Sequence, residues 1–152
     1  MGKQRVKAVY LDVCVLCRPF DDQSVARIRL ETDATFIILD HVRRDDYGLV
    51  VSPLHVVELS EVASGQERAE LLAFLEEYGV QKAWDMARAR GRAEELHRMT
   101  FGLADAAHVA FAEASSDVFV TCDDRLLKKC RKTRLGVLAL DPVEFCTKEG
   151  LK

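Results

Sequence analysis

The sequence predicts an α/β fold: a three-layer sandwich in which helices cover both faces of a mainly parallel sheet. Short apolar runs of strand-forming residues recur along the chain, and segments with helical periodicity separate them. The first run, residues 8–17, is apolar at almost every position, which suits a strand that is covered on both faces. Strands that alternate with helices pair in parallel through right-handed crossovers. These observations together predict the fold class.

Four apolar runs mark the expected strands. They lie at residues 8–17, 49–52, 118–121 and 136–140. The first helix follows a break at Pro19 and a group of capping residues at 21–24. Glu31 falls within the apolar stripe of this helix, where we expect it to pair with Arg27 one turn earlier rather than to bind a ligand.

Proline and glycine mark the ends of the later helices. Pro53 suits the first turn of a helix after the second strand, and Gly79 is expected to stop the helix that begins near Gln66. A polar helix is expected from Gln81 onward, loosened at Gly91. The expected helices span about 24–44, 53–63, 66–78, 81–98, 104–114 and 124–132, and a short helix follows Pro142.

Composition predicts a single soluble domain over residues 1–152. The chain is 49% hydrophobic and 31% charged, and its formal net charge of -3 argues against binding polyanions through bulk charge. It has no apolar run long enough for a membrane span and no secretory signal, so we expect a cytoplasmic protein without a membrane partner. Five cysteines are an odd count, as expected for free thiols in a reducing compartment.

Four acidic residues are expected to meet at one edge of the sheet. They are Asp12 at the end of the first strand, Glu58 in the helix after the second strand, Asp105 at the start of an alanine-rich helix, and Asp123 after the next strand. Parallel strands bring their carboxyl ends to one edge, where α/β sheets bind ligands. Crowded carboxylates repel one another unless a cation joins them, and ligands that are all oxygen favour Mg²⁺ or Mn²⁺.

Each acid also has a purely structural interpretation. Asp105 and Asp123 have the position of helix N-caps, and Glu58 could lie on a solvated helix face. Asp12 is the hardest to explain in this way, because the helix that follows it already has capping candidates.

The motifs around the four acids resemble those of the PIN-domain family. These are small metal-dependent ribonucleases that include the VapC-type toxins of toxin–antitoxin pairs. The resemblance runs nearly end to end and is carried by residues 10–16, 56–59, 103–110 and 120–127. It implies that Asp12, Glu58, Asp105 and Asp123 are the catalytic, metal-binding acids. It also implies that Thr121 steadies the site and that Asp124 is an auxiliary acid.

The same resemblance implies a Mg²⁺- or Mn²⁺-dependent endoribonuclease that hydrolyses single-stranded RNA. It further implies a small antitoxin partner and a homodimer. One departure matters: many family members carry a hydroxyl residue and then an asparagine after the first acid, and here those positions are Val13 and Cys14. Lost hydrogen bonds to metal ligands weaken metal affinity or activity about 10- to 100-fold. A PIN fold with weakened catalysis that binds RNA or protein is therefore the second hypothesis.

Histidines and cations near these motifs are the remaining candidates. His108 follows Asp105 by three residues, so it could orient an acid, approach a phosphate or simply pack in the core, and His55 stands in the same relation to Glu58. The candidates for RNA binding are Arg18, Arg125, Lys128, Lys129, Arg131 and Lys132. Cations near a helix C-terminus are equally explained by the helix dipole.

A third hypothesis is thiol redox chemistry at Cys14 and Cys17, which have the C-x-x-C spacing. A redox pair of this type normally opens a helix. We expect these cysteines in or just after the first strand, which disfavours that chemistry.

Overall fold

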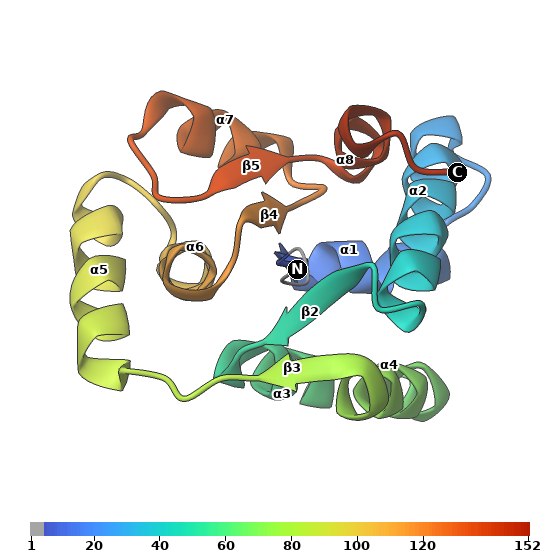
Figure 1. The fold of residues 1–152 in the computed structure, drawn as a ribbon, viewed down its shortest axis with the longest axis horizontal. Helices are drawn as coiled ribbons and strands as arrows, with labels where there is room; N and C mark the ends of the chain where they lie inside the picture. Colours follow the sequence, from blue (N-terminus) through green and yellow to red (C-terminus); the bar gives the residue numbers. More distant parts are fainter. Residues whose placement is uncertain (1–4) are drawn as a thin grey trace.

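The computed structural model describes residues 5–152 and has a five-stranded sheet in which every strand pairs in parallel with its neighbours (Figure 1). The strand order is β3-β2-β1-β4-β5, so the first strand lies at the centre. The strands are β1 (Lys7–Leu11), β2 (Tyr47–Val51), β3 (Gly79–Gln81), β4 (Val118–Val120) and β5 (Leu138–Leu140). The helices are α1 (Val13–Cys17), a 3₁₀ turn η1 (Arg18–Phe20), α2 (Ala26–Arg43), α3 (Pro53–Ser60), α4 (Gly65–Tyr78), α5 (Met86–Arg98), α6 (Leu103–Ser115), α7 (Asp124–Lys132) and α8 (Pro142–Glu149).

The strands divide their side chains between two hydrophobic cores, because successive residues of a strand point to opposite faces. In β1, Val9 and Leu11 enter the core that α1, α2, α4 and α8 cover, whereas Tyr10 enters the core beneath α5, α6 and α7. Figure 1 shows the sheet between these two groups of helices. The predicted α/β sandwich is confirmed, and its sheet is entirely parallel.

The first apolar run was wrongly predicted as one strand. Strand β1 ends at Leu11, and residues 13–17 form α1, with Asp12 at its N-cap position. An apolar run has no periodicity that separates a buried strand from a buried helix. Here Val15 and Leu16 are buried in the core as helical residues.

The sequence prediction missed β3 and placed a helix from residue 81. Gly79 does end α4, but it also begins β3, and the next helix starts only at Met86 and continues through Gly91. A Cβ at Gly79 would collide with the carbonyl oxygen of Leu75 and the side chain of Val51. Glycine is therefore needed here for the close approach of α4 to the sheet. Three residues on a sheet edge, two of them exposed, carry too little hydrophobic pattern to be recognised as a strand.

Candidate functional site

Two of the predicted acids follow strands at the carboxyl edge of the sheet. Asp12 follows β1 directly, and Asp123 follows β4 and caps α7 by accepting hydrogen bonds from the backbone N–H groups of Arg125 (2.9 Å) and Leu126 (3.2 Å). Asp105 lies in the first turn of α6, whose N-cap is Gly102, so the alternative of Asp105 as the N-cap is wrong. Asp123, in contrast, does serve as a cap.

Thr121 joins two of these acids. Its hydroxyl donates to Asp12 Oδ2 at 2.8 Å and accepts from the backbone N–H of Asp123 at 3.1 Å. The side chain has no exposed surface, and Asp12 is 8% exposed. A buried carboxylate needs such a donor, because burial without one is costly. The residue predicted to steady the site is therefore in contact with Asp12 and with the backbone of Asp123.

Glu58 contacts His108 across the two helices that carry them. The Nε2 atom of His108 lies 2.9 Å from Glu58 Oε1. His108 is buried, at 2% exposure, whereas the Glu58 side chain is 30% exposed. Glu58 therefore lies at the boundary between core and solvent, and the buried His108 ring contacts its carboxylate from the core side. Of the three roles considered for His108, contact with an acid is the one the geometry favours.

The charge state of Asp105 reflects its neighbours. Burial raises the pKa of the Asp105 carboxyl, and the carboxylates of Asp12 and Asp123 raise it further, while Lys129 acts in the opposite direction. Like charges disfavour ionisation only where they are close. Asp105 therefore lies close enough to Asp12 and Asp123 for their charges to raise its pKa.

The donor set fits a hard divalent cation. Carboxylate oxygens are the ligands that Mg²⁺ and Mn²⁺ prefer. Burial is the main cause of the raised pKa of Asp105, and the neighbouring carboxylates of Asp12 and Asp123 add a repulsion that a cation would offset. Within residues 5–152, no three His, Cys, Asp or Glu side chains already stand in a group that could hold a metal ion. Mg²⁺ usually keeps several waters and takes one or two protein carboxylates, so it does not require such a group.

Cys14 stands at the position where the resemblance to the PIN-domain family implies asparagine, and its side chain reaches Asp12. Its Sγ atom lies 3.4 Å from Asp12 Oδ2 and 3.5 Å from Thr121 Oγ1, and it accepts from the backbone N–H of Cys122 at 3.4 Å. A thiol is a weaker donor than an amide N–H. The contact that the departure was expected to remove is therefore replaced by a weaker one.

The two cysteines with C-x-x-C spacing lie on α1 rather than in a strand, so the original objection to redox chemistry does not hold. Both thiols are free. Burial raises the pKa of Cys17 to about 11, which leaves little thiolate at neutral pH. A reactive redox cysteine needs the opposite shift. The structure therefore disfavours this chemistry for a different reason.

Asp124 and Arg18 are held by ion pairs on the neighbouring helix α2. Both carboxylate oxygens of Asp124 accept from Arg27 at 2.6 Å, and this lowers the pKa of Asp124. Arg18 donates to Glu31 at 2.8 Å and to Asp21 at 3.1 Å. The predicted pairing of Arg27 with Glu31 is confirmed at 3.4 Å. Asp124 therefore fixes α7 to α2, and its role as an auxiliary acid stays a prediction.

The basic residues of α7 divide into two groups. Arg125, Lys128, Arg131 and Lys132 are exposed, whereas Lys129 is half-buried. Lys129 donates to the carbonyl oxygen of Thr100 at 2.7 Å, and Arg131 pairs with Glu144 at 2.6 Å. The exposed group lies on the helix that Asp123 caps, so it is the group best placed to meet a polyanion near the acids.

Three residues of the site were missed or undervalued from the sequence. Tyr10 and Ser52 form a buried chain of hydrogen bonds with His108, and the Nε2 atom of His55 lies 2.6 Å from the carbonyl oxygen of Leu11. Burial lowers the pKa of His55 to about 4, so this histidine is neutral. The only signal in the sequence was polar side chains within apolar segments.

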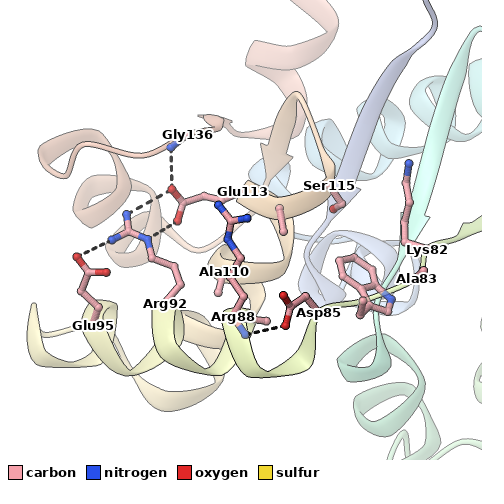
Figure 2. Close-up of a pocket in the computed structure, with 13 residues that line it drawn as sticks. Lys82, Ala83, Asp85, Arg88, Arg92, Glu95, Ala110, Glu113, Ser115 and Gly136 are labelled. Carbon is pink, nitrogen blue, oxygen red and sulfur yellow. Dashed lines mark hydrogen bonds and ion pairs between the residues drawn. The ribbon is translucent and has the colours of Figure 1, made fainter.

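A pocket lies away from these acids (Figure 2). It has a volume of 730 Å³ and lies between α5 and α6, where Trp84, Arg88 and Glu113 contribute to its lining. Figure 2 shows that Arg92 pairs with Glu113, which also accepts from the backbone N–H of Gly136. With a rise of 1.5 Å per residue, Asp105 and Glu113 are about 12 Å apart along α6. The pocket is therefore not formed by the acids.

Comparison with known proteins gives one family and one fold. The model of the family described as "PIN domain" matches residues 9–132. No match to a curated protein reaches significance. A chain in the "Structure of FitAB bound to IR36 DNA fragment" aligns with a TM-score of 0.55 and 17% identity, covering 89% of this chain and 95% of that one. A chain of FitAcB from Neisseria gonorrhoeae gives a TM-score of 0.49 and 17% identity, covering 88% and 97%.

Proposed function

The chain belongs to the PIN domain family, and on that premise we propose that it is a metal-dependent endoribonuclease that hydrolyses single-stranded RNA. PIN domains are typically metal-dependent nucleases. The observation that carries the proposal is the link between acids far apart in the sequence: Thr121 contacts both Asp12 and the backbone of Asp123, and both carboxylates act on Asp105.

Asp12, Glu58, Asp105 and Asp123 are the residues that would hold a Mg²⁺ or Mn²⁺ ion. When bound, such an ion activates water and offsets the charge that develops on a phosphodiester. The protein's own contribution is to fix the acids. Thr121 holds Asp12 from the buried side, and His108 holds Glu58. The exposed cations of α7 would hold the RNA backbone next to Asp123.

The proposal extends to a toxin role, with a small antitoxin protein as partner, a homodimeric assembly and a cytoplasmic location. Membership of the PIN domain family supports the toxin role, and FitAB is among the solved structures with a similar chain. Of the helices in residues 5–152, none has the length and apolar character to cross a membrane.

The second candidate is a PIN fold with weakened catalysis that binds RNA or protein. Val13 offers no hydroxyl, and Cys14 contacts Asp12 only through a thiol at 3.4 Å. This candidate predicts that the wild type binds RNA but cleaves it only slowly. It also predicts that Cys14→Asn, which supplies the amide of the relatives, raises cleavage about 10- to 100-fold.

The test is Mn²⁺-dependent cleavage of single-stranded RNA by the wild type, Asp12→Asn and Asp33→Asn. Asp33 is an exposed acid of α2 and serves as the matched control. We expect Asp12→Asn to abolish cleavage and Asp33→Asn to leave it unchanged. Equal cleavage by wild type and Asp12→Asn would identify a contaminating nuclease and remove the proposal.

A further inference from the structure

We propose that Ser52, Tyr10 and His108 form a buried relay of hydrogen bonds that positions Glu58, making all three positioning residues. The inference rests on the proposed function, because Glu58 is one of the acids assigned to the metal. It adds residues other than the four acids: Tyr10 of the central strand, Ser52 directly after the neighbouring strand, and His108 of α6.

The relay is continuous from the core to the site. Ser52 Oγ lies 2.7 Å from the Tyr10 hydroxyl, that hydroxyl lies 2.6 Å from His108 Nδ1, and His108 Nε2 lies 2.9 Å from Glu58 Oε1. Ser52, Tyr10 and His108 are at most 2% exposed. Each distance is within the range of a well-formed hydrogen bond. Buried polar side chains in such a chain are ordered by one another, so its outer end is held in one place.

The chemistry of the end groups fixes the direction of the relay. An ionised carboxylate only accepts, so His108 Nε2 carries the proton that Glu58 accepts. In this tautomer Nδ1 is an acceptor and takes the proton of the Tyr10 hydroxyl, which in turn accepts from Ser52.

A neighbouring histidine keeps Ser52 in position. The backbone N–H of Ser52 donates to His55 Nδ1 at 3.0 Å, so His55 carries its proton on Nε2 and donates it to the carbonyl oxygen of Leu11. Leu11 immediately precedes Asp12. The same group of buried side chains therefore supports the backbone beside the first acid and the side chain of the second.

Glu58 depends on this support because of its surroundings. Its neighbours on α3, Val56 and Val57, are 49% and 55% exposed. Within residues 5–152, the hydrogen bond to His108 is the only one that the Glu58 side chain forms. A glutamate on a partly exposed helix face samples many rotamers unless a donor holds it. Removal of the donor would leave the carboxylate free to turn toward solvent.

The experiment compares three substitutions on the full chain. His108→Leu removes the donor, His108→Gln retains an N–H donor near the position of Nε2, and Tyr10→Phe removes only the hydroxyl behind the ring. The readouts are Mn²⁺ affinity by calorimetry and kcat and KM for RNA cleavage. His97→Leu, in α5 and outside the relay, is the matched control, because its Nδ1 contacts the Phe101 carbonyl oxygen.

We expect His108→Leu to weaken Mn²⁺ binding about 10- to 100-fold and to lower kcat more than it raises KM. His108→Gln should restore most of the affinity, Tyr10→Phe should lose less than His108→Leu, and His97→Leu should bind as the wild type does. Equal losses in the Leu and Gln variants would show that packing of the ring matters and would overturn the relay. Unchanged affinity in Tyr10→Phe and His108→Leu would do the same.

Nitrogen NMR of the histidine rings in the metal-free protein separates this inference from the proposed function. The relay requires the Nε2–H form of His108, and a shift of its Nδ1 resonance in Tyr10→Phe. An Nδ1–H form would refute the relay even in an active enzyme. If the wild type neither binds Mn²⁺ nor cleaves RNA, the proposed function fails, and the ring spectra alone decide whether His108 holds Glu58.

Discussion

Replacement of Thr121 by valine tests the link between the acids most directly. The change keeps the shape of the side chain but removes the hydroxyl that donates to Asp12 and accepts from Asp123. A hydrogen bond to a charged group contributes about 1.5–3 kcal/mol, and the N–H of Asp123 also loses its acceptor. We therefore expect the free energy of unfolding to fall by about 3 kcal/mol. For a chain of this length that is about 6–12 °C in Tm.

The assay is urea unfolding of the metal-free protein, with Thr35→Val as the matched control. Thr35 is also fully buried, but its hydroxyl donates only to the Glu31 carbonyl oxygen of its own helix, at 2.8 Å. We expect that control to lose less than about 1 kcal/mol. The site interpretation adds a second result, a loss of Mn²⁺ affinity of about 10- to 100-fold in Thr121→Val alone. Equal destabilisation by the two substitutions would refute the reasoning.

Three further predictions follow from individual contacts. Because burial and the neighbouring carboxylates raise the pKa of Asp105 in the folded state, the metal-free protein should lose stability as the pH rises through that pKa. At pH 8, Asp105→Asn should therefore unfold at a higher temperature than the wild type, and it should bind Mn²⁺ poorly. An equal or lower Tm would contradict the destabilising effect of the ionised Asp105 carboxylate. Glu31→Gln should cost about 3 kcal/mol in urea unfolding, because Arg18 loses a carboxylate that is only 4% exposed; a loss below about 1 kcal/mol would show that the pair contributes little. Gly79→Ala should cost about 1–3 kcal/mol, because its Cβ meets backbone that cannot move easily, whereas Gly91→Ala, in open space, should be neutral or stabilising.

Part of the candidate site could be predicted from the sequence, because several of its residues lie close in the chain to the strands that position them. The order of apolar runs and helical segments predicts a parallel sheet, and a parallel sheet brings its carboxyl ends to one edge. Asp12 directly follows β1, and Asp123 lies three residues after the end of β4, so knowledge of the strands was enough to place them. Thr121, two residues before Asp123, came with the same motif.

The tertiary structure decided what each of these residues touches. Residues 13–17 became a helix and residues 79–81 a strand, because short apolar or edge segments take the conformation that their neighbours leave room for. The partner of Glu58 lies 50 residues further along the chain, and that of Asp124 lies 97 residues away. No local pattern encodes such pairs, since they form only when α3 meets α6 and when α2 meets α7. The sequence thus determined which acids face the edge of the sheet, and only the packing of the helices determined what holds them there.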